Sequence, residues 1–100
     1  MAAVLFDDND RSYLQWLLEN PEGYVVNMRR RFDPNYVVLH RSNCLSVNRY
    51  LGMDSNPGGF TERSYRKVCG ASITQLVSFL ERFEDGSYSI SSACSKCEPA

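Results

Sequence analysis

Apolar side chains recur every three or four positions in two segments, and this period predicts two amphipathic helices. In residues 8–19 the apolar face consists of leucines, Leu14, Leu17 and Leu18. Asp8 or Asp10 could cap the free N–H groups at the start, where a carboxylate also favours the helix dipole. Pro21 follows, and the residue before a proline disfavours helical backbone. The first helix is therefore expected over residues 8–19.

The second helical segment covers residues 73–83 and carries the longer apolar stripe. Its members are Ile73, Leu76, Val77, Leu80 and Phe83. Ser72 precedes the stripe and Gln75 lies three positions later, which is the pattern of a capping box. We expect this helix to lie with its apolar face against a sheet.

Three other segments are rich in β-branched and aromatic residues and predict strands. They cover residues 24–28, 36–40 and 64–69. Asp33-Pro34-Asn35 separates the first two and is favourable turn chemistry, so these strands are expected to pair as an antiparallel hairpin. Residues 88–90 are a candidate for a short edge strand.

These elements predict the α+β class, with a small antiparallel sheet of three or four strands and two helices on one face. The 100 residues are expected to form a single domain, residues 1–100. Glycine and proline gather in residues 49–63, so this segment is predicted to be a flexible loop. A domain of this size buries only about 60–65% of its unfolded surface, so a metal ion that staples the fold would add useful stability.

Charge and hydropathy narrow the classes of function. The net charge is −1, so the overall field does not attract nucleic acid. No apolar run approaches the ~20 residues that span a bilayer, and the first residues lack the basic and apolar regions of a secretory signal. We therefore expect a cytoplasmic protein without a membrane partner. In a reducing compartment the four cysteines are expected to be ligands or free thiols rather than disulfides.

Two short spacings place metal-binding side chains in pairs. His40 and Cys44 form His-x3-Cys, and Cys94 and Cys97 form Cys-x2-Cys. One imidazole and three thiolates are a ligand set of closed structural zinc sites. The sequence therefore predicts a structural zinc ion bound by these four residues.

Alternatives remain for the same residues. His40 could be a hydrogen-bonded histidine at a strand end, with the cysteines as small apolar core residues. Cys69 is expected to fill the core, and it is the substitute ligand if His40 points away. A thioredoxin-like role for Cys94 and Cys97 is disfavoured, because only three residues follow Cys97 and no helix can start there to lower a thiol pKa.

Basic residues gather at the first predicted turn. Arg29, Arg30 and Arg31 are consecutive, and Arg41 lies beside the predicted metal site. The run is either a solvated hairpin tip or, together with Arg41, a basic face that contacts phosphates. No glycine-rich phosphate loop precedes a helix, and we identify no catalytic residue.

The segment from Val38-Leu39-His40 to Cys94-Ser95-Lys96-Cys97 is similar to a small zinc-binding fold. It resembles the N-terminal zinc domain of the bacterial adaptive-response alkyl-DNA repair proteins, and related domains beside nucleases. In that fold a strand leads to ligand-x3-Cys, a helix follows, and Cys-x2-Cys completes the site. The first ligand of the repair domain is a cysteine that accepts a methyl group. His40 stands at that position here, so the resemblance implies a structural metal without methyl transfer.

Three stretches also resemble a family of small bacterial domains of uncharacterised function, namely Gly23-Tyr24-Val25-Val26-Asn27, Val38-Leu39-His40-Arg41 and Lys67-Val68-Cys69. Together these patterns favour a non-catalytic, nucleic-acid-associated module with a structural zinc site. The alternative is a metal-free protein-interaction or regulatory domain, which an exposed apolar patch would favour. Nothing in the sequence indicates the oligomeric state.

Overall fold

The structure is a computed structural model that describes residues 3–31, 33–44, 47–48, 61, 65–83 and 88–99. Within them lie the strands β1 (Val4–Phe6), β2 (Tyr24–Arg29), β3 (Val37–Arg41), β4 (Tyr65–Gly70) and β5 (Ser92–Ala93), and the helices α1 (Asp10–Glu19) and α2 (Ile73–Arg82). The loop predicted at residues 49–63 lies outside the described residues except for Thr61.

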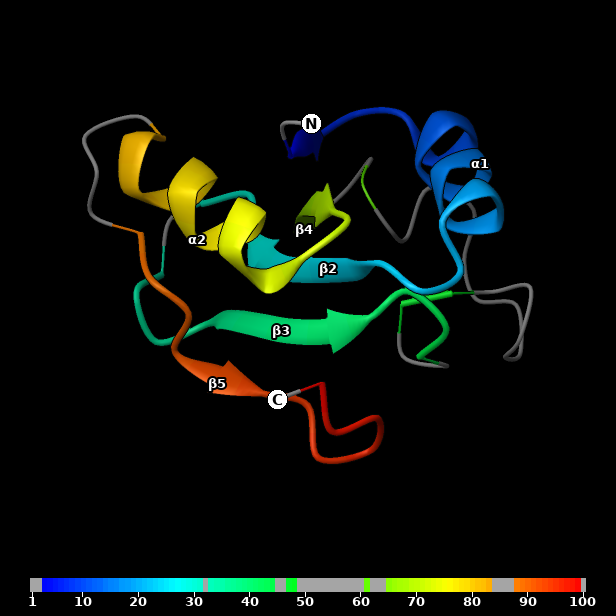
Figure 1. Ribbon diagram of the computed structural model, residues 1–100. Coiled ribbons are helices and arrows are strands. Elements are labelled where there is room, and N and C mark those ends of the chain that lie inside the picture. Colours follow the sequence, from blue (N-terminus) through cyan, green and yellow to red (C-terminus); the bar gives the residue numbers. More distant parts are fainter. Residues whose placement is uncertain are drawn as a thin grey trace.

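All five strands belong to one sheet with the order β1-β4-β2-β3-β5 (Figure 1). The first four strands of this order pair antiparallel, whereas β5 pairs parallel with β3. The α+β class is therefore confirmed, with a mixed sheet of five strands in place of an antiparallel sheet of three or four. The edge strand expected at residues 88–90 lies instead at Ser92–Ala93.

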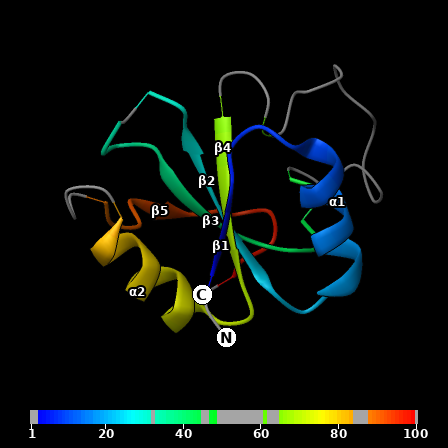
Figure 2. The same cartoon turned by 90° about the horizontal axis from the view of Figure 1, so that it is seen from above.

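The two helices cover opposite faces of the sheet, which differs from the expectation of both on one face (Figure 2). Val25 and Val26 are neighbours in β2, so their side chains point to opposite faces. Val25 packs in a core cluster with Leu17 of α1, and Val26 packs in a second cluster with Leu80 of α2. A central strand that is apolar on both faces allows a helix on each side.

The helix starts follow local capping chemistry. Ser72 caps α2, and its Oγ accepts a hydrogen bond from the Gln75 backbone N–H at 3.2 Å. The capping pattern predicted from the sequence is thus confirmed at Ser72. At α1 the cap is Asn9, whose Oδ1 accepts from the Ser12 N–H at 2.9 Å, in place of the expected Asp8 or Asp10.

The core cluster under α1 extends to one end of the sheet, where the cysteines gather. Tyr13 and Leu14 of α1 are fully buried in it together with Cys44, and Cys94 and Cys97 pack against its border. The Tyr13 hydroxyl donates a hydrogen bond to the Val47 carbonyl at 2.6 Å, close to Cys44 in the chain. The α1 core therefore supports the segment that carries Cys44.

Candidate metal centre

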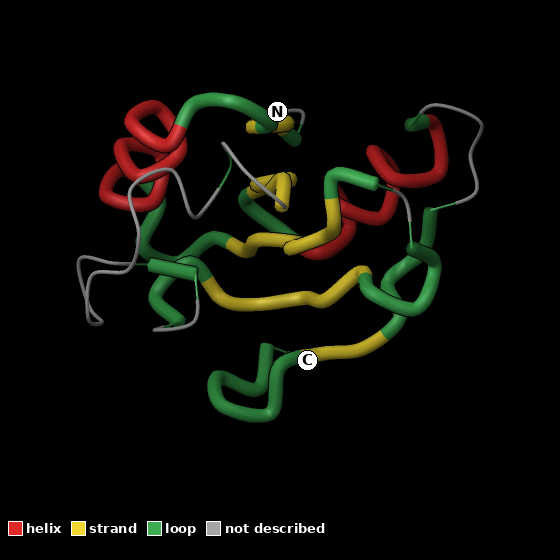
Figure 3. The backbone as a smooth tube through the Cα atoms, turned by 180° about the vertical axis from the view of Figure 1, so that it is seen from behind, coloured by secondary structure: helices red, strands yellow, loops and turns green. Residues whose placement is uncertain are grey.

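The parallel pairing of β3 and β5 brings the two predicted ligand pairs together. Parallel neighbours end at the same edge of a sheet, so the segments that follow β3 and β5 leave the sheet side by side (Figure 3). Leu39 pairs with Ala93, and one further step of this register places His40 opposite Cys94. The Cys94 N–H donates to the Leu39 carbonyl at 2.9 Å, which fixes this alignment.

Each pair is completed by a turn. After β3, the Cys44 N–H donates to the Arg41 carbonyl at 3.0 Å, and this turn carries Cys44 back toward His40. After β5, the Glu98 N–H donates to the Cys94 carbonyl at 3.0 Å and closes a turn that contains Cys97. The x3 and x2 spacings are thus the lengths of two tight turns.

The ligand atoms of His40, Cys44, Cys94 and Cys97 all lie within 4.8 Å of one another. The sulfurs of Cys44 and Cys94 are 3.9 Å apart, and all the cysteines are free thiols. Four ligands around tetrahedral zinc are separated by about 3.5–3.8 Å, given metal–ligand distances of about 2.0–2.3 Å. The predicted convergence is confirmed, and the four residues form a candidate metal-binding cluster whose spacing is slightly wider than a filled zinc site.

His40 is 5% exposed, and its Nδ1 is a buried nitrogen without a hydrogen-bond partner among the described residues. The alternative of a satisfied strand-end histidine therefore lacks the hydrogen bond that it requires at this atom. Burial, and secondarily the charge of Lys67, lowers the pKa of His40 to about 4. The ring is therefore neutral at pH 7, which is the form that binds metals.

The thiols have contrasting surroundings. Burial raises the pKa of Cys94, but hydrogen bonds, first from the backbone N–H groups of Lys96 and Cys97, outweigh it and lower that pKa below its ordinary value. Burial raises the pKa of Cys97 to about 11, although its Sγ accepts a hydrogen bond from the Arg41 N–H at 3.3 Å. Backbone N–H groups directed at the sulfurs are the outer contacts that orient thiolate ligands in metal sites.

Cys69 lies in the core and outside the candidate cluster. It pairs with Val25 across β4 and β2, and Val25 pairs with His40 across β2 and β3. Two strand spacings, about 10 Å, therefore separate Cys69 from His40. Cys69 is fully buried against α1, and burial raises its pKa well above the usual value. These surroundings suit an unreactive core residue.

The four arginines predicted to contact nucleic acid do not form a single face. Arg41 pairs with Tyr24 at one end of the β2–β3 hairpin, whereas Arg29 ends β2 at the other. The Arg41 guanidinium donates to the carbonyls of Cys97 at 2.9 Å and Glu98 at 3.0 Å. Arg41 therefore belongs to the surroundings of the metal cluster and holds the second turn in place.

The consecutive arginines also differ from one another. Arg30 donates to the carbonyls of Asp7 and Thr61 and thereby ties the hairpin to the α1 side. The Arg29 side chain is 44% exposed, and Arg31 is exposed. Arg29, Arg30 and Arg31 are therefore all exposed and lie outside the metal centre, but the Arg30 guanidinium already donates to backbone carbonyls.

Sequence reasoning missed the structural role of Arg41 and the burial of Lys67 in the sheet. Lys67 is 3% exposed in β4, and burial lowers its pKa to about 7. Its Nζ donates to Asn27 Oδ1 at 2.7 Å. The imperfect alternation of residues 64–69, with a lysine on the face that carries Cys69, was the available signal.

No described helix has the length and apolar character that crossing a membrane requires. Comparison with protein-family models, with curated proteins and with solved structures finds no match to this chain. The resemblance to zinc domains of alkyl-DNA repair proteins therefore stays a prediction from the residues, and the functional argument rests on the site itself.

Proposed function

We propose that His40, Cys44, Cys94 and Cys97 bind a structural zinc ion in a non-catalytic module whose partner is nucleic acid. The observation that carries the metal proposal is the convergence of four ligand atoms within 4.8 Å from two distant segments. Three thiolates and one imidazole suit zinc, and four protein ligands leave no open position for a substrate. The ion would act as a staple rather than as a reaction centre.

A zinc ion at this place would hold a weakly paired segment of the fold in position. β5 contains only two residues, Ser92–Ala93, and strands this short contribute little pairing energy of their own. A metal bound by Cys94 and Cys97 on one side and His40 and Cys44 on the other would fix the segment after β5 to the end of β3. Free energy of metal binding at such a site becomes free energy of folding.

Metal content and melting temperature test the proposed structural zinc site. The protein purified without chelator should contain one zinc per chain, and chelation should lower its melting temperature. Cys94→Ser should lose the zinc, whereas Ser95→Ala, an exposed change in the same turn, should retain it. Protein without zinc, with a melting temperature that chelator does not change, would contradict the proposal and favour the metal-free interaction domain.

Nucleic acid is favoured as the partner by the exposed cations at the β2–β3 turn. Arg29 and Arg31 are exposed at the sheet end opposite the metal cluster, where they could contact phosphates. The exposed large apolar residues among the described ones lie on separate elements, Val4 on β1, Leu18 on α1 and Val77 on α2. Since α1 and α2 cover opposite faces, Leu18 and Val77 do not share one patch for a protein partner.

Fluorescence anisotropy with labelled DNA and RNA tests this partner. Affinity should fall steeply with salt, because bound phosphates release counterions. Replacing Arg29 and Arg31 together by alanine should weaken binding and flatten the salt dependence. Arg82→Ala, an exposed arginine on α2, is the matched control and should leave both unchanged. Absence of binding to any nucleic acid would contradict this part of the proposal.

A further inference from the structure

A row of three side chains crosses the sheet at the end opposite the metal cluster. Arg29 at the end of β2 pairs with Tyr65 at the start of β4. On its other side Met28 pairs with Val37, and one further step places Tyr36 beside Arg29. We call Tyr65, Arg29 and Tyr36 the tyrosine–arginine row.

The three side chains of the row lie close to one another. The rings of Tyr36 and Tyr65 are 5.8 Å apart between centroids. The Arg29 guanidinium lies 4.5 Å from the Tyr36 ring and 5.6 Å from the Tyr65 ring. The two ring planes are tilted by 41° to each other, and the guanidinium lies over both rings, whose quadrupoles attract it.

The row lies on the sheet face that carries α1, but beyond the part that α1 covers. Tyr65 and Cys69 are four positions apart in β4 and so share a face, and Cys69 packs against α1. The two tyrosines of the row are only half-buried, and the Arg29 side chain is 44% exposed. Solvent therefore reaches an aromatic surface that carries a cation.

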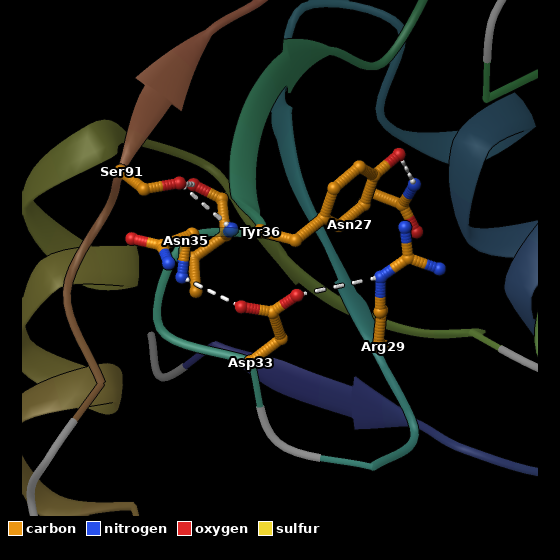
Figure 4. Close-up of polar contacts among 7 residues, drawn as sticks. Asn27, Arg29, Asp33, Asn35, Tyr36 and Ser91 are labelled. Carbon is orange, nitrogen blue, oxygen red and sulfur yellow. Dashed lines mark hydrogen bonds and ion pairs between the residues drawn. The ribbon is translucent and has the colours of Figure 1, made fainter.

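Polar contacts hold Tyr36 and Arg29 of the row in position (Figure 4). Asn27 Nδ2 donates to the Tyr36 hydroxyl at 3.4 Å, and Asn27 Oδ1 accepts from Lys67 Nζ at 2.7 Å. Arg29 Nε lies 3.7 Å from Asp33 Oδ2 in an ion pair. Because these groups are already ordered, a ligand that stacks on the row would not have to order them on binding.

The chemistry of the row fits bases and phosphates. Single strands bind to proteins by stacking bases on aromatic side chains and on arginine planes, with cations along the backbone. We propose that the tyrosine–arginine row binds single-stranded nucleic acid, with a base stacked on Tyr36 or Tyr65 and phosphates at Arg29 and Arg31. This inference rests on the proposed nucleic-acid function and deepens it, because a duplex keeps its bases stacked inside and cannot offer their faces.

The experiment is anisotropy titration of the zinc-loaded full chain at low salt. Its probes are an oligothymidylate of about 12 nucleotides, within the known site sizes of single-strand-binding folds, the matching oligouridylate, a DNA duplex of the same length and an acidic peptide. Single strands should bind more tightly than the duplex. Tyr65→Leu or Tyr36→Leu should raise the single-strand Kd about 5- to 150-fold, the range of one lost stacking contact.

Conservative variants separate stacking from structural damage. Tyr65→Phe keeps the ring and should keep affinity within roughly twofold of the original, whereas Tyr65→Leu keeps apolar bulk and loses the ring. Circular dichroism and melting temperature verify that each variant folds. If both leucine variants are folded, a single-strand affinity that neither of them lowers would overturn the inference. If they do not fold, the Phe variant, which should keep its affinity, and iodination of Tyr36 and Tyr65 decide the matter. Bound nucleic acid should protect the two rings from iodination. Unprotected rings would overturn the inference.

The outcomes also separate this inference from the function on which it rests. Tighter binding to the duplex than to single strands would overturn the single-strand inference and leave a nucleic-acid module. Binding to neither form would overturn both proposals. Binding to the acidic peptide alone would assign the row to a protein partner and would likewise overturn both.

Discussion

The sulfur of Cys44 lies 3.9 Å from the sulfur of Cys94, although 50 positions separate these residues in the chain. Such a distance is close to one edge of a tetrahedral zinc–thiolate site and far longer than the roughly 2 Å of a disulfide. The approach depends on β3 and β5 running in the same direction. A change that disturbs the pairing of β3 with β5 is therefore expected to weaken both metal binding and stability.

Loss of a single ligand should destabilise the whole domain when zinc is present in the medium. Cys44→Ala removes a proposed ligand that is 3% exposed, and with it should go most of the zinc-linked stability, which is several kcal/mol against a total of about 5–15 kcal/mol. Urea unfolding with and without chelator measures this difference. Chelator should destabilise the original protein and have no further effect on the variant; equal chelator effects on both would contradict the ligand assignment.

The side of α2 that packs against the core gives a prediction for stability. Leu80 is 1% exposed, so Leu80→Ala should reduce the free energy of unfolding by about 2–5 kcal/mol through the cavity it leaves. Thr74 is exposed on the same helix, and Thr74→Ala should change stability by less than about 0.5 kcal/mol. Urea unfolding measures both. Similar values for the two variants would show that the helix faces another way.

Buried Lys67 should make stability depend on pH between about 7 and 9. Burial lowers its pKa from 10.5 to about 7, while Asp10 and Cys69 partly oppose this shift. Between these values the unfolded state holds a proton that the folded state lacks, so stability rises with pH by up to about 1.4 kcal/mol per unit. Above pH 9 the raised pKa values of Cys69 and Tyr13 act in the opposite direction, because the unfolded thiol and phenol then ionise first.

Unfolding measured at several pH values checks this slope, and Lys67→Met provides the control. The methionine has similar length and no charge, so the part of the rise between pH 7 and 9 that Lys67 causes should disappear, leaving the rise of the same sign from the lowered pKa of Cys94. The titration of His40, whose pKa is lowered to about 4, falls below this window and does not interfere. An unchanged slope in the variant would assign the pH dependence to another group.

A side chain at Gly23 should destabilise the fold. A Cβ there would lie 2.8 Å from Trp16 Cη2, 3.1 Å from the Gly70 carbonyl oxygen and 3.2 Å from Ser42 Oγ. Gly23→Ala should therefore cost about 1–3 kcal/mol by overpacking. The Gly23 carbonyl also accepts the Ser42 N–H at 3.0 Å, so the variant should weaken zinc affinity through the turn that carries Cys44.

Thermal unfolding and a competitive zinc titration test the Gly23 variant against Glu22→Ala. Glu22 is the exposed neighbour, and its replacement should leave both quantities nearly unchanged. A stable Gly23→Ala protein with full zinc affinity would mean that the approach of Trp16 is looser than the structure indicates.

Features encoded by neighbouring residues could be predicted from the sequence. The helix α2 with its buried Leu76 and Leu80, its cap at Ser72 and the hairpin at the 33–35 turn each depend on residues a few positions apart; Val77 of the predicted stripe is exposed. The two residue pairs of the candidate metal cluster were also local, because each pair is one tight turn. In these cases the interactions that form the element join residues of the same short segment in which the pattern is seen.

Features set by tertiary pairing could not be predicted. β1 and β5 have three and two residues, too few for an alternating pattern. Val25 and Val26 are both buried, so β2 has no polar face from which to assign the helices to sides. The place of Arg41 depended on the hairpin register, which put it beside Cys97 and away from Arg29.

The position of β4 between β1 and β2 has a consequence for how the chain folds during synthesis. The β2–β3 hairpin can pair as soon as its own residues are made. β1 precedes it but has no partner until β4 has been translated and has added to the free edge of β2. Such a long-range pairing is slow to form, so β1 is expected to remain exposed to chaperones and proteases while the ribosome completes the middle of the chain.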